Sequence, residues 1–273
     1  MDRLVFLLLS QVTAGGVLLL RLVPPRRAGN TFFWVMGGTF LLLSFLALIS
    51  DLAFWARSAA QNDLQAGSLL EVGVLLTLIP SLGLYTWAAW TGRDGNRRVA
   101  WIVATLSAVG LVTVSAWGLV PSVAPFGTWI LLVANFLAAA LLLGSVTTGM
   151  VLAHWYLVAR RLPLAPLRRM VGILIVASVL VGVLTVLGNL AGDVARAALP
   201  EPLTVPSATF PVLVFWRVAA GIAAPFVLGL MIRQAVVYRT TTAATGLLYV
   251  AVLSAWGGTL VARYLLLGTG VLW

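Results

Sequence analysis

The single histidine of the chain, His154, is followed directly by Trp155 and Tyr156 and then by Arg160. These side chains are of types that can bind a polar ring. Imidazole donates and accepts hydrogen bonds and exchanges a proton near neutral pH, and the neighbouring phenol and indole are donors as well. One interpretation is a headgroup site in which His154 hydrogen-bonds a quinone oxygen, with Trp155, Tyr156 and Arg160 around it. The other is an interfacial aromatic belt, in which these residue types lie at headgroup depth without a ligand.

Five charged residues stand inside or at the ends of otherwise apolar segments: Asp51, Glu71, Asp193, Arg217 and Arg263. A charge inside a bilayer is costly, so each is expected to have a partner or a polar cavity. Glu71 and Arg217 precede the prolines of two similar motifs, "PSLGL" and "PFVLGL", by nine and eight residues, so the two charges could meet at matching depth. We consider two alternatives, a buried ion pair that locks the molecule and a polar cavity for a ligand or for protons.

The composition predicts that the helices carrying these residues lie in a membrane. Of 273 residues, 62% are hydrophobic and 9% are charged, which is more apolar surface than a soluble domain of this length can bury. A helix of about 20 apolar residues crosses the roughly 30 Å hydrocarbon core. Eight such segments predict an all-α integral membrane protein, with spans near 4–23, 32–55, 69–91, 99–120, 128–158, 170–192, 209–231 and 241–266.

The 17 basic residues, all arginine, are distributed unequally between the predicted connections. The connections after the first, third, fifth and seventh spans hold most of them, namely Arg21, Arg26, Arg27, Arg93, Arg97, Arg98, Arg160, Arg161, Arg168, Arg169, Arg233 and Arg239. The opposite side holds Arg3, Arg57 and Arg196. By the positive-inside rule, the arginine-rich loops are predicted to be cytoplasmic and both termini non-cytoplasmic. The net charge of +10 therefore does not indicate nucleic-acid binding.

The first apolar segment is expected to be a retained helix. It lacks the basic region that precedes the apolar part of a signal peptide, and its arginines follow the apolar run instead.

An internal similarity runs through the chain at an offset of 134 residues. Residues 11–27, "QVTAGGVLLLRLVPPRR", and 145–161, "SVTTGMVLAHWYLVARR", share seven of 17 positions, including a threonine, a glycine and the closing Arg-Arg pair. The register continues through Met36/Met170, Gly38/Gly172, Ser44/Ser178 and Leu46/Leu180, and "VSAWG" (114–118) is echoed by "LSAWG" (253–257). Two copies of a four-helix unit enter the membrane from the same side. We therefore expect two pseudo-symmetric four-helix bundles in parallel orientation, residues 1–125 and 126–273.

The sequence lacks the residues and motifs that several kinds of chemistry require. Without cysteine, the chain forms no disulfide, thiolate metal site or cysteine-held iron–sulfur cluster. One histidine cannot supply both axial ligands of a bis-histidine haem, and no Walker loop, H-E-x-x-H or G-x-S-x-G motif is present. Any such group is therefore expected on a partner.

The chain resembles the membrane subunits of the superfamily that anchors polysulfide reductase, nitrite reductase and dimethyl sulfoxide reductase (the NrfD, PsrC and DmsC type). The resemblance lies in the eight helices, the duplication and the first helix, "LLLSQVTAGGVLLLRLVP" (7–24), which is similar to the opening helix of DmsC-type anchors. It implies a cofactor-free subunit of the prokaryotic cytoplasmic membrane that binds menaquinone or ubiquinone. Such a subunit exchanges electrons with an iron–sulfur or cytochrome subunit, and it can be coupled to proton movement.

Two other functions are alternatives to this one. A secondary transporter or permease would carry its substrate between the two bundles past Asp51, Glu71, Arg217 and Arg263. A non-catalytic scaffold subunit would use the same polar residues only for packing. The redox subunit predicts bound quinone and a co-purifying partner, the transporter predicts function alone in liposomes, and the scaffold predicts tolerance of alanine at all these positions.

Overall fold

The computed structural model describes residues 2–60, 66–120, 125–158, 162–191 and 205–272. In these ranges the chain forms helices without any strand. The helices are α1 Asp2–Leu19, η1 Leu20–Leu22, α2 Pro25–Ala60, α3 Ala66–Thr91, α4 Asp94–Trp117, α5 Phe126–Val158, α6 Ala165–Ala191, α7 Phe210–Val218, η2 Ala219–Ala223, α8 Ala224–Val237 and α9 Thr241–Thr269. With α7, η2 and α8 counted as one, eight of the described segments are long and apolar enough to cross a membrane. The prediction of an all-α membrane protein is confirmed at this level.

Several helices extend beyond the predicted spans. Helix α2 begins at Pro25, α6 begins at Ala165 and α8 ends at Val237, whereas the apolar segments suggested 32, 170 and 231. Hydropathy falls where arginines begin, but the backbone hydrogen bonds of a helix continue past that point. Near the start of α2, Gly29 adopts φ 79°, a conformation that residues with a Cβ rarely adopt, and kinks the helix.

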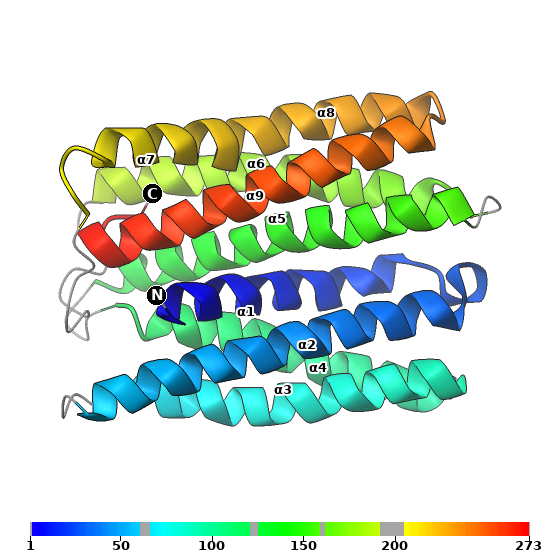
Figure 1. The fold of residues 1–273 in the computed structure, drawn as a ribbon, viewed down its shortest axis with the longest axis horizontal. Helices are drawn as coiled ribbons and strands as arrows, with labels where there is room; N and C mark the ends of the chain where they lie inside the picture. Colours follow the sequence, from blue (N-terminus) through cyan, green and yellow to red (C-terminus); the bar gives the residue numbers. More distant parts are fainter. Residues whose placement is uncertain (1, 61–65, 121–124, 159–161, 192–204, 273) are drawn as a thin grey trace.

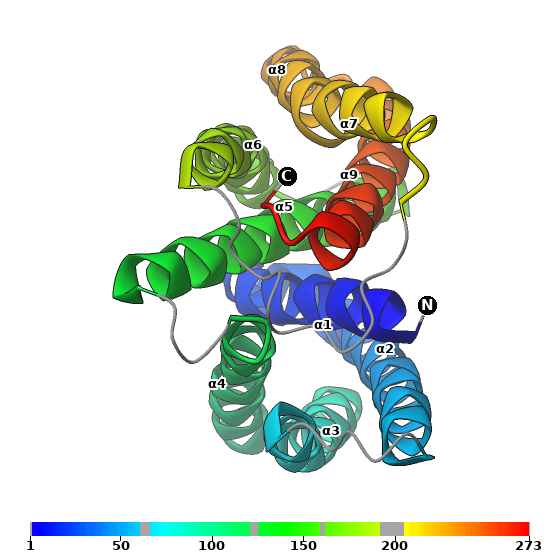
Figure 2. The ribbon, with the colours of Figure 1, turned by 90° about the vertical axis from the view of Figure 1, so that its left-hand side faces the viewer.

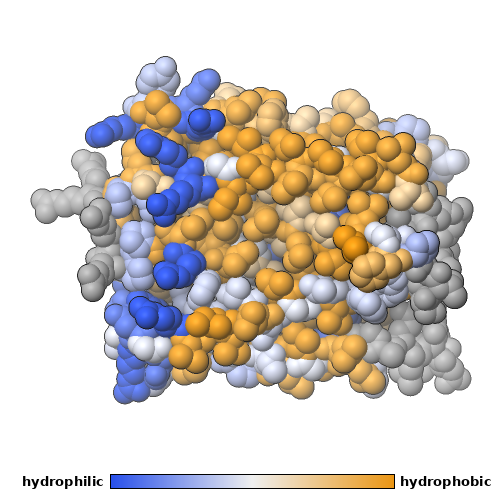
Figure 3. All heavy atoms as spheres, turned by 180° about the vertical axis from the view of Figure 1, so that it is seen from behind, coloured by the Kyte–Doolittle hydropathy of each residue, from blue (hydrophilic) through white to orange (hydrophobic). Residues whose placement is uncertain are grey.

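The two ends of the helical bundle differ in charge. The short connections after α1, α3, α5 and α8 lie at one end, and both termini lie toward the other (Figure 1). We call the first the arginine end, because its exposed side chains include Arg21, Arg93, Arg98, Arg168, Arg169, Arg233 and Arg239. We call the second the terminal end, where α1 begins and α9 finishes. Figure 3 shows hydrophilic side chains gathered at one end of a broad apolar band.

The helices form two groups, α1–α4 and α5–α9, with α1 and α5 side by side between them (Figure 2). In the first group α1 packs on α2 and α4, α2 on α3, and α3 on α4. In the second group α5 packs on α6 and α9, α6 on α8, and α8 on α9. The groups meet where α1 packs on α5, α4 on α5 and α1 on α9. Each group is thus a ring of four spans with the same order of neighbours.

Glycines allow the closest approaches between helices. A Cβ on Gly15 of α1 would overlap the carbonyl of Ala140 in α5, and one on Gly144 would overlap the backbone of Gly15. In the second group, the π-helical turn η2 brings Gly221 against Gly258 of α9 with a similarly small separation. Such contacts between small residues bring two backbones together where the hydrophobic effect does not act between helices.

Candidate functional site

The three neighbouring residues that suggested a headgroup site point in different directions at the arginine end of α5. The His154 side chain is exposed on the surface of the bundle. Trp155 donates its indole N–H to the Ala28 carbonyl oxygen at 3.2 Å and packs edge-on against Phe32. Tyr156 is 4% exposed and donates its hydroxyl to the Pro163 carbonyl oxygen at 2.5 Å. The structure therefore does not gather these side chains around one cavity.

Two of the three residues hold the polypeptide connections in place. The hydrogen bond of Trp155 fixes the start of α2, and that of Tyr156 fixes the segment that leads into α6. His154 remains available to a molecule outside the bundle. Arg160, the fourth member of this predicted site, lies outside the described residues.

A buried ion cluster forms at the terminal end of the first group, from α1, α2 and α3. Arg3 donates through Nη1 and Nη2 to the two oxygens of Glu71, at 2.5 and 2.8 Å. Its Nη1 also lies 3.3 Å from Oδ1 of Asp51. Both carboxylates have no exposed surface, and Arg3 is 12% exposed. This is the paired, two-point geometry in which arginine binds a carboxylate most strongly.

The charges of this cluster do not balance. One guanidinium faces two carboxylates, and Oδ2 of Asp51 has no hydrogen-bond partner within the described ranges. A buried charge without a partner is expensive in a low-dielectric interior. The cluster therefore joins α1, α2 and α3 through Arg3 and leaves one carboxylate oxygen without a partner among the described residues.

A second buried arginine lies where the two groups of helices meet. Arg263 of α9 is 1% exposed, donates to the Asn135 side-chain oxygen at 3.1 Å, and contacts the side-chain amide of Gln11 at 3.3 Å through Nη2. Its guanidinium also lies 3.7 Å from the centre of the Phe136 ring. Because arginine only donates, the Gln11 oxygen must face it. No carboxylate of the described chain lies within ion-pair distance of Arg263.

Arg217 of α7 is another buried arginine. It is 2% exposed and its Nη2 lies 3.4 Å from the Thr185 hydroxyl. The contact with Glu71 that the sequence suggested is not formed, since both oxygens of Glu71 bind Arg3 instead. Asp193, also part of the predicted polar set, lies outside the described residues.

The sequence placed Arg3 on the side of the membrane with few arginines and predicted no partner for it. Its position in the first turn of a helix, at the same end as Asp51 and Glu71, is the feature that could have indicated one. A long arginine side chain can reach neighbouring helices at that depth. Gln11 of α1 and Asn135 of α5 both contact Arg263 of α9. Within the described ranges, no three acidic or histidine side chains are grouped as metal ligands.

No protein-family model, curated protein or solved structure matches this chain.

Proposed function

We propose that this chain is a cofactor-free, quinone-interacting anchor subunit of a multi-subunit redox complex. The observation that carries the proposal is an exposed imidazole inside a membrane span, His154 in the candidate span Phe126–Leu157. Quinones dissolve in the bilayer, so a residue that binds one from the lipid must lie on the outer surface of the bundle near the headgroups. Trp155 and Tyr156 hold the end of α5, which fixes the direction of the imidazole.

In this proposal His154 hydrogen-bonds a carbonyl oxygen of menaquinone or ubiquinone and exchanges a proton with it. Arg160, which follows six residues after His154 in the sequence, is included in this proposed site. The Arg3–Asp51–Glu71 cluster takes part in proton transfer, since two carboxylates share one arginine. Electrons reach the quinone from an iron–sulfur or cytochrome subunit, because this chain has no cysteine and a single histidine.

The proposal includes an internal duplication, which the buried faces of α2 and α6 support. The buried positions of the two helices coincide at the offset of 134: Phe32/Pro166, Phe33/Leu167, Met36/Met170, Phe40/Leu174, Ser44/Ser178, Ala47/Val181 and Asp51/Thr185. The hydroxyls of Ser44 and Ser178 even donate to equivalent carbonyl oxygens, those of Phe40 and Leu174, at 2.8 Å in both helices. A shared face of this kind is expected of two copies of one unit.

The later helices support the same duplication at a different offset. Buried residues of α4 and α9 coincide at 147: Ala104/Ala251, Ala108/Ala255, Leu111/Gly258, Val112/Thr259, Ser115/Ala262 and Ala116/Arg263. The "SAWG" echo suggested 139, but at that offset the buried Leu111 would correspond to the exposed Val250. The alignment given by the "SAWG" motif therefore differs by about two helical turns from the alignment given by the buried faces.

The π-helical turn accounts for one residue of the difference between the copies. Before it, Glu71 and Leu75 correspond to Arg217 and Gly221 in burial, at an offset of 146. After it, the offset is 147, through Leu78/Pro225, Leu82/Gly229, Tyr85/Ile232, Ala88/Ala235 and Ala89/Val236. A π turn closes its hydrogen bonds over five residues instead of four, so it holds one inserted residue without ending the helix.

The orientation and location in this proposal follow from the arginines. The arginine end faces the cytoplasm and both termini lie outside, in agreement with the positive-inside rule. The membrane is then the cytoplasmic membrane of a prokaryote. This orientation places His154 at the cytoplasmic headgroup layer and the Arg3–Asp51–Glu71 cluster toward the outer layer.

The proposal is tested by purifying the complex from native membranes in a mild detergent and identifying both proteins and extracted quinones by mass spectrometry. We expect a co-purifying iron–sulfur or cytochrome subunit and bound quinone. His154→Ala should weaken quinone binding roughly fivefold to tenfold, the effect of losing one hydrogen bond. Gln234→Ala, which changes an exposed polar residue near the same end of α8, is the matched control and should have no effect.

A lone, quinone-free protein that remains folded would overturn the redox proposal. Reconstitution of that protein alone in liposomes would then test the transporter alternative through Asp51, Glu71, Arg217 and Arg263. Alanine at these four positions should abolish transport if they line a path.

A further inference from the structure

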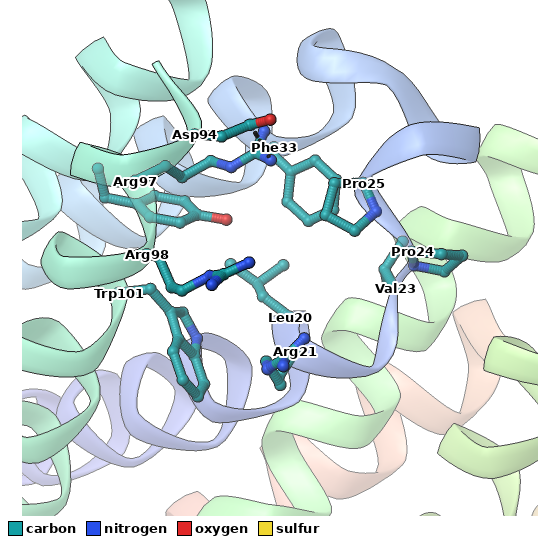
Figure 4. A pocket seen from close by; sticks show the side chains of 11 residues that line it. Leu20, Arg21, Val23, Pro24, Pro25, Phe33, Asp94, Arg97, Arg98 and Trp101 are labelled. Atoms are coloured by element: carbon teal, nitrogen blue, oxygen red, sulfur yellow. Dashed lines mark ion pairs between the residues drawn. The ribbon is translucent and has the colours of Figure 1, made fainter. Parts of the chain in front are cut away.

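A cavity of about 480 Å³ opens at the arginine end of the first group of helices (Figure 4). It lies between the end of α1 with η1, the start of α2, the end of α3 and the start of α4. Its lining is formed by Leu20, Arg21, Val23, Pro24, Pro25, Phe33, Tyr85, Asp94, Arg97, Arg98 and Trp101. The cavity is distinct from the surface around His154, which lies on α5.

The lining carries more positive than negative charge. Its one carboxylate, Asp94, is bound by Arg97 at 2.6 Å. Arg97 also donates from Nη1 to the Asn30 side-chain oxygen at 3.2 Å and lies over the Phe33 ring at 5.3 Å, so both of its terminal nitrogens have a polar partner. Arg97 is 9% exposed and forms a fixed part of the wall.

Arg21 and Arg98 leave an excess of two positive charges at the cavity. Neither forms an ion pair with any carboxylate of the described residues, although Arg21 lies 6.0 Å from the Trp101 ring. Figure 4 shows both side chains directed toward the space between η1 and α4. Like charges repel, so two guanidinium groups facing one cavity favour an anion between them.

The walls around these charges are rigid and aromatic. Trp101 donates its indole N–H to the Val17 carbonyl oxygen at 2.8 Å, which fixes α4 against α1. Tyr85 is 3% exposed and lines the cavity together with Phe33. Such a site offers planar donors for tetrahedral oxyanions and apolar surface for attached carbon chains.

The charged and aromatic residues that α3 and α4 contribute to this lining are replaced by other residue types in the second group of helices. At the offset of 147, Asp94, Arg97, Arg98 and Trp101 correspond to Thr241, Ala244, Thr245 and Leu248. Tyr85 corresponds to Ile232. The charged and aromatic groups are thus particular to the first group, and they do not arise simply because arginines collect at this end of the membrane.

We propose that the cavity binds a phosphate-bearing anion, either the headgroup of an anionic phospholipid or free phosphate. Arg21 and Arg98 bind the phosphate oxygens, and Arg97, held by Asp94, supports the wall behind them. Phosphate fits better than a neutral ring because arginine pairs with phosphate oxygens through two parallel hydrogen bonds. The location at headgroup depth makes a lipid available to the site, as in other basic pockets between membrane helices.

The test compares three forms of the purified protein in nanodiscs: wild type, the double variant R21Q/R98Q, and the control R168Q/R169Q. The control removes the same charge from two exposed arginines of α6 at the same end but outside the cavity. Phosphatidylglycerol in a phosphatidylcholine background is the probe, and lipid retained after transfer to detergent is counted by native mass spectrometry. Circular dichroism and the thermal midpoint verify that each variant is folded.

We expect wild type and control to retain phosphatidylglycerol over phosphatidylcholine and R21Q/R98Q to bind it at least about tenfold more weakly, because two charge-assisted contacts are lost. If inorganic phosphate protects the protein against heat and displaces the lipid, free phosphate is the ligand; if it does neither, the lipid headgroup is. Equal losses in the two double variants would overturn the proposal, as would a wild type that retains neither lipid nor phosphate. Should R21Q/R98Q fail to fold, R98K preserves the charge but removes the two-point contact, and unchanged binding in R98K would also overturn it.

Discussion

Arg3 and Arg263 both lie toward the terminal end with little exposed surface, but the groups around them differ in charge. Arg3 lies in the first group of helices between Glu71 and Asp51, at 2.5 and 3.3 Å. Arg263 lies between the two groups and contacts only amides and an aromatic ring, those of Gln11, Asn135 and Phe136 among the described residues. One site therefore has a surplus of negative charge and the other a surplus of positive charge.

The difference shows which arginine is held by carboxylates and which by neutral hydrogen-bond partners. Removing the cation from a buried cluster leaves its carboxylates stranded, whereas removing a cation that has only neutral partners leaves no opposite charge behind. Asp51 and Glu71 are buried in the first group, whereas the described buried charges of the second group are Arg217 and Arg263.

The largest effect is expected at Arg3. Arg3→Gln should lower the free energy of unfolding by about 3–5 kcal/mol, because Glu71 and Asp51 remain buried without a cation. Unfolding in mixed detergent micelles, followed by circular dichroism, measures this change. Arg57→Gln is the control, since Arg57 pairs with Asp2 on the surface with 64% of its side chain exposed. The control should cost less than about 1 kcal/mol, and equal losses at both sites would contradict the role of buried charge.

A smaller effect is expected at Arg263. Arg263→Met keeps much of the side-chain volume and removes a cation without a carboxylate partner, so the loss should not exceed about 2 kcal/mol, mainly from the amide oxygens left without donors. The same unfolding measurement applies. A loss as large as that of Arg3→Gln would show that an anion accompanies Arg263 in the membrane, and the comparison of the two sites would then fail.

The smallest effect is expected at Asp51. Asp51→Asn removes the surplus negative charge while Arg3 keeps both contacts to Glu71, so stability should stay within about 1 kcal/mol of the wild type. Glu71→Gln is the matched change on the other carboxylate and should cost more, because it replaces an oxygen that accepts from Arg3 at 2.5 or 2.8 Å. The reverse order of the two variants would mean that Asp51 is the main partner of Arg3.

The positions of the helices along the chain were largely predictable, whereas the composition of the site was not. Hydropathy located eight spans, and only the ends were displaced, as at Pro25 and Val237, where arginines interrupt the apolar run but not the helix. The offset of 134 pairs Met36 with Met170 and Ser44 with Ser178, and all four residues are buried. The "SAWG" echo has an offset of 139, whereas the buried faces of α4 and α9 coincide at an offset of 147.

The candidate site could not be read from spacing along the chain. His154, Trp155 and Tyr156 are consecutive, but successive residues of a helix are about 100° apart and therefore face different neighbours. Glu71 and Arg217 stand before similar motifs, yet Arg3 is the residue that reaches Glu71. The position of each charged residue along its helix indicated which charges lie at the same end of the bundle. It gave no information on how each helix is rotated about its axis.

The sequence by itself determined that eight segments are long and apolar enough to span a membrane and which ends of these segments share arginine. These properties follow from local hydropathy and charge, which depend on the order of residues alone. The tertiary structure decided that Arg3 binds Glu71, that Arg263 meets Gln11 and Asn135, and that Arg21 and Arg98 face one cavity. Those contacts depend on the rotation and crossing of helices, which the packing of small residues such as Gly15 against Gly144 sets between segments far apart in the chain.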